Sequence, residues 1–142
     1  MKDKLTPEQS QHLIELGVAP SRASMCQIQH SADGETIYSI VEHDEFCYEM
    51  SCLHPKPIFD LSDILSLLPK RIDDLILSIF GTMVDELAKA AKEGWMVSYV
   101  DEHVEAESKD TIFQAPELID ALYELLCWVL QNHPDKIKTL KR

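Results

Sequence analysis

The sequence predicts an α+β fold in which a small, mostly antiparallel sheet packs against a long C-terminal helix and shorter helices. One observation is the amphipathic pattern from Pro116 to about Asn132, which is typical of a helix with one buried face. Another is a series of short β-prone stretches separated by polar turns. The 142 residues, 45% hydrophobic and 27% charged, suffice for one core. We therefore expect a single domain at residues 1–134, followed by a solvated basic tail at residues 135–142.

The first helix is predicted to begin after Thr6. Thr6 can cap it, Pro7 suits the first helical position, and Gln9 can reach back to complete a capping box. Gly17 ends it, because glycine readily adopts the conformation that closes a helix.

A hairpin is predicted next, because β-prone stretches at residues 25–29 and 35–41 flank a polar turn that contains Gly34. The second stretch has apolar residues at both odd and even positions, so the pattern does not show which face is buried. Residues 43–57 lack clean periodicity and are expected to be mostly loop, with room for one short strand at residues 46–50.

A second helix is predicted after Asp60, which can cap it, with Asp63 in the first turn and Pro69 as the stop. The apolar residues of this helix are Leu61, Ile64, Leu65, Leu67 and Leu68.

Residues 72–94 are ambiguous, because their apolar residues also fit one long helical stripe. Gly81 favours a break in that stripe. We therefore expect a strand at residues 75–80, followed by a helix at residues 83–93 that Gly94 closes.

Strands at residues 95–100 and 111–113 are predicted to form another hairpin around an acidic, solvated stretch. The last helix, from Pro116 to about Asn132, is the clearest element. Its predicted apolar face comprises Leu118, Ile119, Leu122, Leu125, Leu126, Val129 and Leu130.

Trp128 lies beyond the edge of that face, on the flank shared with Glu117, Ala121 and Glu124. It should therefore miss the centre of the core. Two roles stay open. In the favoured alternative, Trp128 is expected to pack under a second covering element of its own domain, such as the first helix or the tail after His133. Otherwise Trp128, with Glu117 and Glu124, contributes to a self-association or partner surface.

The formal net charge of −12 is unevenly distributed along the chain. No Lys or Arg occurs between Arg22 and Lys56, a segment that is rich in Asp and Glu. Because nucleic-acid binding depends on cations that neutralise phosphates, direct DNA or RNA binding is disfavoured. A minority alternative is an acidic nucleic-acid mimic that inhibits a DNA-handling protein.

The N-terminal residues lack the basic-then-apolar layout of a signal peptide, and runs such as residues 75–80 are far shorter than the ~20 residues that cross a bilayer. We therefore expect a soluble cytoplasmic protein with no membrane span. In a reducing compartment the cysteines are expected to be free thiols that pack in the core. They are Cys26, Cys47, Cys52 and Cys127.

One candidate metal site consists of His43, Cys47, Cys52 and His54, which are residue types that zinc accepts. The four residues between the two cysteines include no glycine for a tight turn, and structural zinc sites usually place cysteines closer together. Buried thiols beside surface histidines are therefore the favoured interpretation, and a zinc-binding or enzymatic domain built around these residues is the alternative.

Other catalytic patterns are absent from the sequence. The 4 glycines are scattered, so no phosphate-binding loop is indicated, and there is no nucleophile elbow. Acid pairs such as Asp44 with Glu45, or Glu105 with Glu107, are expected to be solvated rather than catalytic. We expect no cofactor, and an enzyme is the less favoured class.

Several segments together resemble a family of small uncharacterised proteins from gut anaerobic bacteria and their prophages and mobile elements. The segments are Leu-Ile-Glu-Leu-Gly-Val at residues 13–18, Leu-Leu-Pro-Lys-Arg-Ile at 67–72, Trp-Met-Val-Ser-Tyr at 95–99 and Glu-Leu-Ile-Asp-Ala-Leu-Tyr-Glu-Leu-Leu-Cys-Trp at 117–128, with Ala-Ser-Met at 23–25. Residues 81–93 look like an insertion relative to that family. The resemblance implies a strand at residues 75–80 and a mobile-element context, and it implies no activity.

The function expected from the sequence is that of a non-enzymatic cytoplasmic accessory protein that acts through protein contacts. A protein partner or self-association is expected, without nucleic acid or membrane. This expectation depends on the absence of catalytic patterns and on the family resemblance.

Overall fold

The protein is described from a computed structural model, which covers residues 2–32, 34–42, 55–82, 94–101 and 112–137. Internal contacts divide the chain into two compact units. We name Asp3–Asp63 with Thr139–Arg142 the N-terminal unit, and Met1–Lys2 with Ile64–Lys138 the C-terminal unit. The predicted single domain at residues 1–134 stays a prediction.

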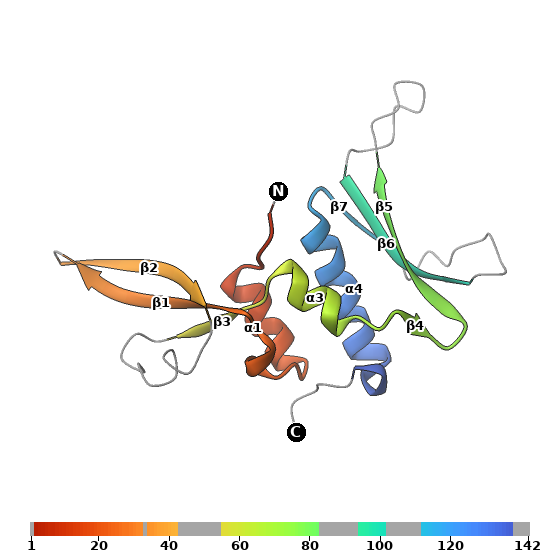
Figure 1. Ribbon diagram of the computed structural model, residues 1–142, viewed down its shortest axis with the longest axis horizontal. Helices are drawn as coiled ribbons and strands as arrows, with labels where there is room; N and C mark the ends of the chain where they lie inside the picture. Colours follow the sequence, from red (N-terminus) through yellow and green to blue (C-terminus); the bar gives the residue numbers. More distant parts are fainter. Residues whose placement is uncertain (1, 33, 43–54, 83–93, 102–111, 138–142) are drawn as a thin grey trace. The chain divides into compact units, whose positions relative to one another are not determined.

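The α+β class predicted from the sequence is confirmed, and the strands form two antiparallel sheets (Figure 1). The strand order is β2-β1-β3 in one sheet and β4-β5-β6-β7 in the other. The strands are β1 (Met25–Ala32), β2 (Glu35–Glu42), β3 (Lys56–Ile58), β4 (Arg71–Ile72), β5 (Leu75–Thr82), β6 (Gly94–Asp101) and β7 (Phe113–Ala115). The helices are α1 (Pro7–Glu15), α3 (Leu61–Leu67) and α4 (Leu118–Asn132), with 3₁₀ turns η1 (Pro20–Arg22) and η4 (Pro134–Lys136).

The predicted capping box of α1 is confirmed. The Thr6 hydroxyl accepts a hydrogen bond from the Gln9 backbone N–H at 3.1 Å, and the Gln9 side-chain oxygen accepts one from the Thr6 N–H at 3.0 Å. These bonds satisfy N–H groups that a helix start otherwise leaves without partners. α1 packs against β3, and its Leu13 and Ser10 are buried. The Ser10 hydroxyl accepts a hydrogen bond from the Phe59 N–H at 3.1 Å.

α3 begins as predicted, and Asp63 connects its first turn to the start of β1. The Asp63 N–H donates to the Asp60 carboxylate at 2.8 Å, and the Asp60 N–H donates to Asp63 at 3.0 Å. The buried Asp63 carboxylate also accepts the Ser24 N–H at 2.8 Å and the Ser24 hydroxyl. A buried carboxylate is tolerated only when such donors surround it, so we assign Asp63 a structural role.

The C-terminal unit is built on the long β5–β6 pairing, which runs from Leu75 opposite Asp101 to Thr82 opposite Gly94. α4 packs against β6 and β7. Val97 and Tyr99 are buried on β6, and the Tyr99 hydroxyl donates to the Pro69 carbonyl at 2.6 Å. The predicted apolar face of α4 is buried except for Leu118, which is half-buried, and Ala121 and Cys127 are buried as well.

Of the two interpretations of residues 72–94, the strand is confirmed as β5, because residues 75–82 pair with β6. The expected role of Gly94, to close a helix at residues 83–93, stays a prediction. Gly94 begins β6, where a Cβ atom would lie 2.6 Å from the Ala115 carbonyl oxygen. The predicted helix at residues 83–93 lies outside the described residues.

Two predicted boundaries also shift. β7 occupies residues 113–115 instead of 111–113, because its pairing with β6 begins at Val97 opposite Phe113. α4 begins at Leu118 instead of Pro116, because Glu117, at φ −106° and ψ 134°, still has extended backbone.

The stretch predicted to be a solvated tail begins with the η4 turn, and Ile137, which follows η4, is buried. Lys136 pairs with Asp73 at 3.5 Å. Residues 138–142 lie outside the described part of the chain. Within the part that is described, no helix combines the length and the apolar character that crossing a bilayer requires.

Candidate protein-binding site

Exposed large apolar side chains gather on two strands. Single exposed apolar residues are normal on protein surfaces, but groups of them mark contact sites. Among the described residues the exposed ones are Ile37, Tyr38 and Ile40 on β2, Ile79 and Phe80 on β5, and Leu65 on α3. β2 therefore carries the largest group on a single element.

The N-terminal unit positions β2 at the edge of its sheet. β2 pairs along all 8 of its residues with β1, and none of the described residues pairs with its other side. We name this outer side, over Glu35–Glu42, the β2 edge. An edge strand presents unpaired N–H and C=O groups, which makes it a template for another strand.

The β2 edge is apolar on both faces of the strand. Side chains alternate between the two faces, so Tyr38 and Ile40 share one face while Ile37 and Val41 share the other. Tyr38 is 59% exposed and Ile40 is 46% exposed. In the register with β1 these two residues lie opposite Gln29 and Gln27, so the side chains directly across from them are polar.

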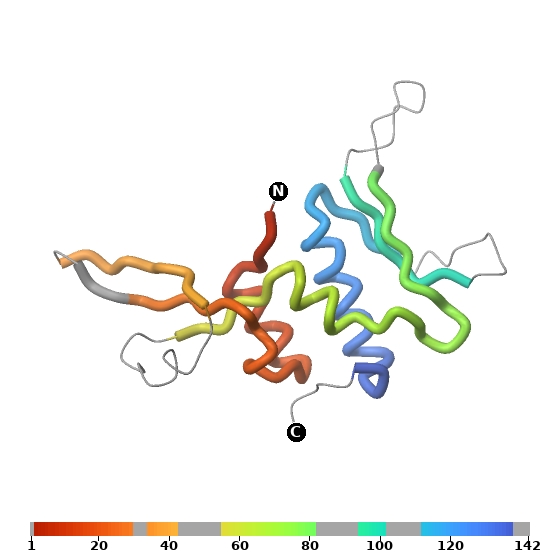
Figure 2. The backbone as a smooth tube through the Cα atoms, viewed as in Figure 1, coloured from red at the N-terminus to blue at the C-terminus, as the bar shows by residue number. Residues whose placement is uncertain are grey.

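Among the described residues, no third strand accompanies the hairpin over most of its length. β3 pairs only with Met25–Gln27, and β1 and β2 continue beyond it as a two-stranded ribbon (Figure 2). The register of this ribbon continues to Ala32 opposite Glu35, next to a turn in which Gly34 has φ +81°. An isolated two-stranded hairpin is only marginally stable in water, and a third strand adds much of the missing stability.

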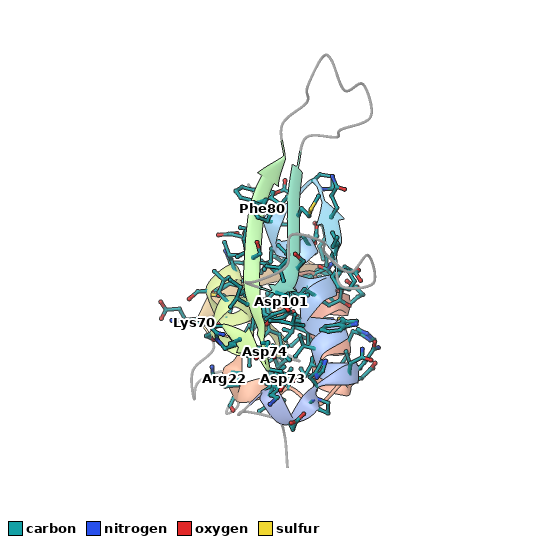
Figure 3. The ribbon with its side chains drawn as sticks, turned by 90° about the vertical axis from the view of Figure 1, so that its right-hand side faces the viewer. Arg22, Lys70, Asp73, Asp74, Phe80 and Asp101 are labelled. Carbon is teal, nitrogen blue, oxygen red and sulfur yellow. The ribbon has the colours of Figure 1, made fainter. Side chains whose placement is uncertain are left out.

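A smaller apolar group lies on β5 in the C-terminal unit. β4 pairs only with Leu75 and Ile76, so in the described chain the rest of β5 has no strand on that side. Phe80 is 50% exposed and lies on β5 at the opposite end from Asp74 (Figure 3). This surface has two exposed apolar side chains, against three on β2.

A hollow of about 560 Å³ lies in the N-terminal unit beside α1. Within it, His12 Nδ1 lies 3.9 Å from Glu15 Oε2, but the two side chains are 43% and 64% exposed. Well-solvated groups of this kind lack the burial that adapts an acid and a base to catalysis. The lining residues are Pro7, Glu8, Gln11, His12, Glu15, Lys56 and Pro57.

The structure places the predicted interaction residues on or next to α4. Trp128 is half-buried, and its ring centroid lies 5.1 Å from that of His133 and 6.5 Å from that of Tyr99. Glu117 accepts a hydrogen bond from the Lys2 N–H at 3.0 Å, and Glu124 is exposed. The ring contacts favour packing within the unit for Trp128, and a role in self-association or partner binding stays a prediction.

The candidate zinc ligands His43, Cys47, Cys52 and His54 all lie outside the described residues, as do the acid pairs Asp44–Glu45 and Glu105–Glu107. Where the structure does describe the chain, no group of three or more metal-ligating side chains occurs.

Cys26 and Cys127 are buried thiols that form no disulfide, as predicted. Burial raises the pKa of the Cys127 thiol to about 11, which disfavours the reactive thiolate.

The sequence contained a signal for the β2 edge that periodicity alone did not resolve. Apolar residues at both odd and even positions of 35–41 left the buried face undecided, and in the structure neither face of β2 is buried along its length. A strand that is apolar on both faces and unburied is typical of a contact surface.

No protein-family model, curated protein or solved structure matches this chain. Function therefore has to be inferred from the residues and their geometry.

Proposed function

We propose that this chain is a non-enzymatic binding protein that acts through protein contacts, with the β2 edge as its contact surface. The observation that carries the proposal is an edge strand of 8 residues that exposes Ile37, Tyr38 and Ile40. Natural proteins usually protect such edges with prolines, charges or bulges, because an open apolar edge invites pairing. β2 has no proline or lysine and its pairing with β1 is continuous, so this protection is missing along most of the strand.

The hollow beside α1 supports an enzymatic function less well, because His12 and Glu15 there are well exposed to solvent. The resemblance to small proteins of gut anaerobes and their mobile elements adds an expectation about the partner. Under this proposal we expect the partner among the proteins that such an element encodes or meets.

Comparative capture from the native host tests the proposal. Tagged wild-type chain is compared with Tyr38→Lys/Ile40→Lys and with the control Ile79→Lys/Phe80→Lys, which makes the same change on β5. Tyr38, Ile40 and Phe80 are well exposed, and Ile79 is 38% exposed, so circular dichroism should show that both variants fold.

We expect at least one protein to be retained by the wild type and the β5 variant and lost from the β2 variant. An identical set of captured proteins for all three chains would contradict the proposal. Stoichiometric zinc in the purified protein, by elemental analysis, would instead support the alternative built around His43, Cys47, Cys52 and His54.

A further inference from the structure

We infer that the β2 edge binds an extended, basic segment of a partner protein, which joins the β2-β1-β3 sheet as a fourth strand. This inference rests on the proposed function, because it names the occupant of the same surface. Three properties of β2 define that occupant: its backbone, its side chains and its charge.

The backbone requires a strand. Along an antiparallel edge every second residue directs its N–H and C=O outward, and a second extended chain satisfies both groups of each such residue. β1 pairs with one side of β2 over Glu35–Glu42, and within the described parts of the chain no strand pairs with the other side. A helix or a loop lacks the repeat that would match these groups.

The side chains require apolar residues on both faces of the added strand. In an antiparallel pair, residues directly opposite each other lie on the same face and contact each other. A partner residue beside Tyr38 or Ile40 would cover one face, and one beside Ile37 would cover the other. β-branched residues fit such positions best.

The charge requires Lys or Arg at the ends of the added strand. Glu35 and Glu42 are exposed at the two ends of β2, and no Lys or Arg occurs between Arg22 and Lys56. Opposite charges across strands stabilise a pair, and like charges destabilise it. The acidic β2 edge therefore complements a basic segment and repels an acidic one.

A second copy of the chain is a poorer occupant on the same grounds. Outward N–H groups occur at every second residue of β2. Two copies of β2 could therefore pair only in registers that place even-numbered residues opposite even-numbered ones and odd-numbered residues opposite odd-numbered ones. The best such register centres on Ser39 and places Tyr38 opposite Ile40. In that register Glu42 of each copy lies opposite Thr36 of the other, so β2, which has no Lys or Arg, offers its copy no opposite charge, and each chain has a net charge of −12.

Peptide binding tests the inference. The probe is a blocked, labelled peptide of about ten residues that alternates valine and threonine and carries lysines at both ends, and its control carries glutamates there. We expect fluorescence anisotropy to show at least about tenfold tighter binding of the lysine peptide at low salt, with the preference declining as salt rises. Equal affinity for the two peptides would overturn the inference.

Variants locate the binding. Tyr38→Lys/Ile40→Lys should weaken binding of the lysine peptide at least about tenfold, and Ile79→Lys/Phe80→Lys should leave it unchanged. Glu35→Gln/Glu42→Gln should reduce the preference for lysine over glutamate and flatten the salt dependence. Loss of binding in the β5 variant alone would overturn the inference.

Two further outcomes separate this inference from the proposed function. If the β2 variant loses its captured partner but neither peptide binds, β2 remains the contact surface and the basic-strand occupant is refuted. If sedimentation shows a dimer that only the β2 variant loses, the occupant is a second copy, and the inference is again overturned.

Discussion

At the scale of single residues, two buried serines show how the same side chain can stabilise or destabilise the fold. Ser10 and Ser98 are both fully buried. The Ser10 hydroxyl accepts a hydrogen bond from the Phe59 N–H, whereas the Ser98 hydroxyl has no hydrogen-bond partner among the described residues. A buried polar group is costly when it lacks a partner and neutral or favourable when it has one.

The substitution of alanine at these two serines should therefore have opposite effects. Ser10→Ala leaves the buried Phe59 N–H without an acceptor and should lower the free energy of unfolding by about 1–3 kcal/mol. Ser98→Ala removes an unsatisfied hydroxyl and should raise it by about 1 kcal/mol. Urea denaturation measures both values, and a loss of stability in Ser98→Ala would show that its hydroxyl does have a partner.

The Cys127 thiol makes stability depend on alkaline pH. Burial raises its pKa from 9.0 to about 11, so the folded state keeps a proton that the unfolded state releases. The unfolded state therefore binds fewer protons between these values, and stability should fall as pH rises from about 9 toward 11. Cys127→Ala should lose less stability over that range than the wild type, as measured by the thermal midpoint. Identical pH profiles would contradict the raised pKa.

At the scale of elements, two glycines near the same end of the β5–β6 pairing differ in their surroundings. A Cβ added to Gly94 would lie 2.6 Å from the Ala115 carbonyl oxygen, whereas one added to Gly81 would lie 3.7 Å from the Trp95 ring. The first distance requires β6 and β7 to separate, and the second is an ordinary contact.

Gly94→Ala should therefore lower the free energy of unfolding by about 1–3 kcal/mol, as overpacked sites do. Gly81→Ala is the matched control and should change stability by less than about 1 kcal/mol. Thermal unfolding of both variants measures the difference. If both substitutions lower the free energy of unfolding equally, Gly94 does not approach β7 as closely as described.

The elements that the sequence predicted well depend on local interactions. The start of α1 follows from Thr6 and Gln9, and the start of α3 from Asp60, because capping bonds join residues three apart. The hydrophobic face of α4 follows from one helical repeat.

The elements that it missed depend on distant partners. The first residue of β6 is Gly94 instead of Trp95, because β6 pairs with β5 from Gly94 opposite Thr82. The same holds for β7, whose first residue is set by the pairing of Phe113 with Val97. The β2 edge was not predicted because the open side of a strand is a property of the sheet order, which sequence periodicity does not contain.

At the scale of the whole molecule, charge and exposed apolar surface favour the same interpretation. The net charge of −12 disfavours nucleic acid as a ligand and favours a basic one. The segment without Lys or Arg, between Arg22 and Lys56, includes the β1–β2 hairpin with its exposed apolar edge. Charge and exposed apolar surface therefore both support the proposed protein partner at β2.

Amide hydrogen exchange along β2 tests the central claim most directly. With the lysine peptide bound, every second amide of residues 35–42 should exchange more slowly, because only alternate N–H groups face the added strand. In the described chain, the part of β5 beyond Ile76 also has no strand on its outer side. Its amides should exchange at the same rate with and without the peptide. Binding of the peptide without any slowing in β2 would contradict the claim that this edge is the contact surface.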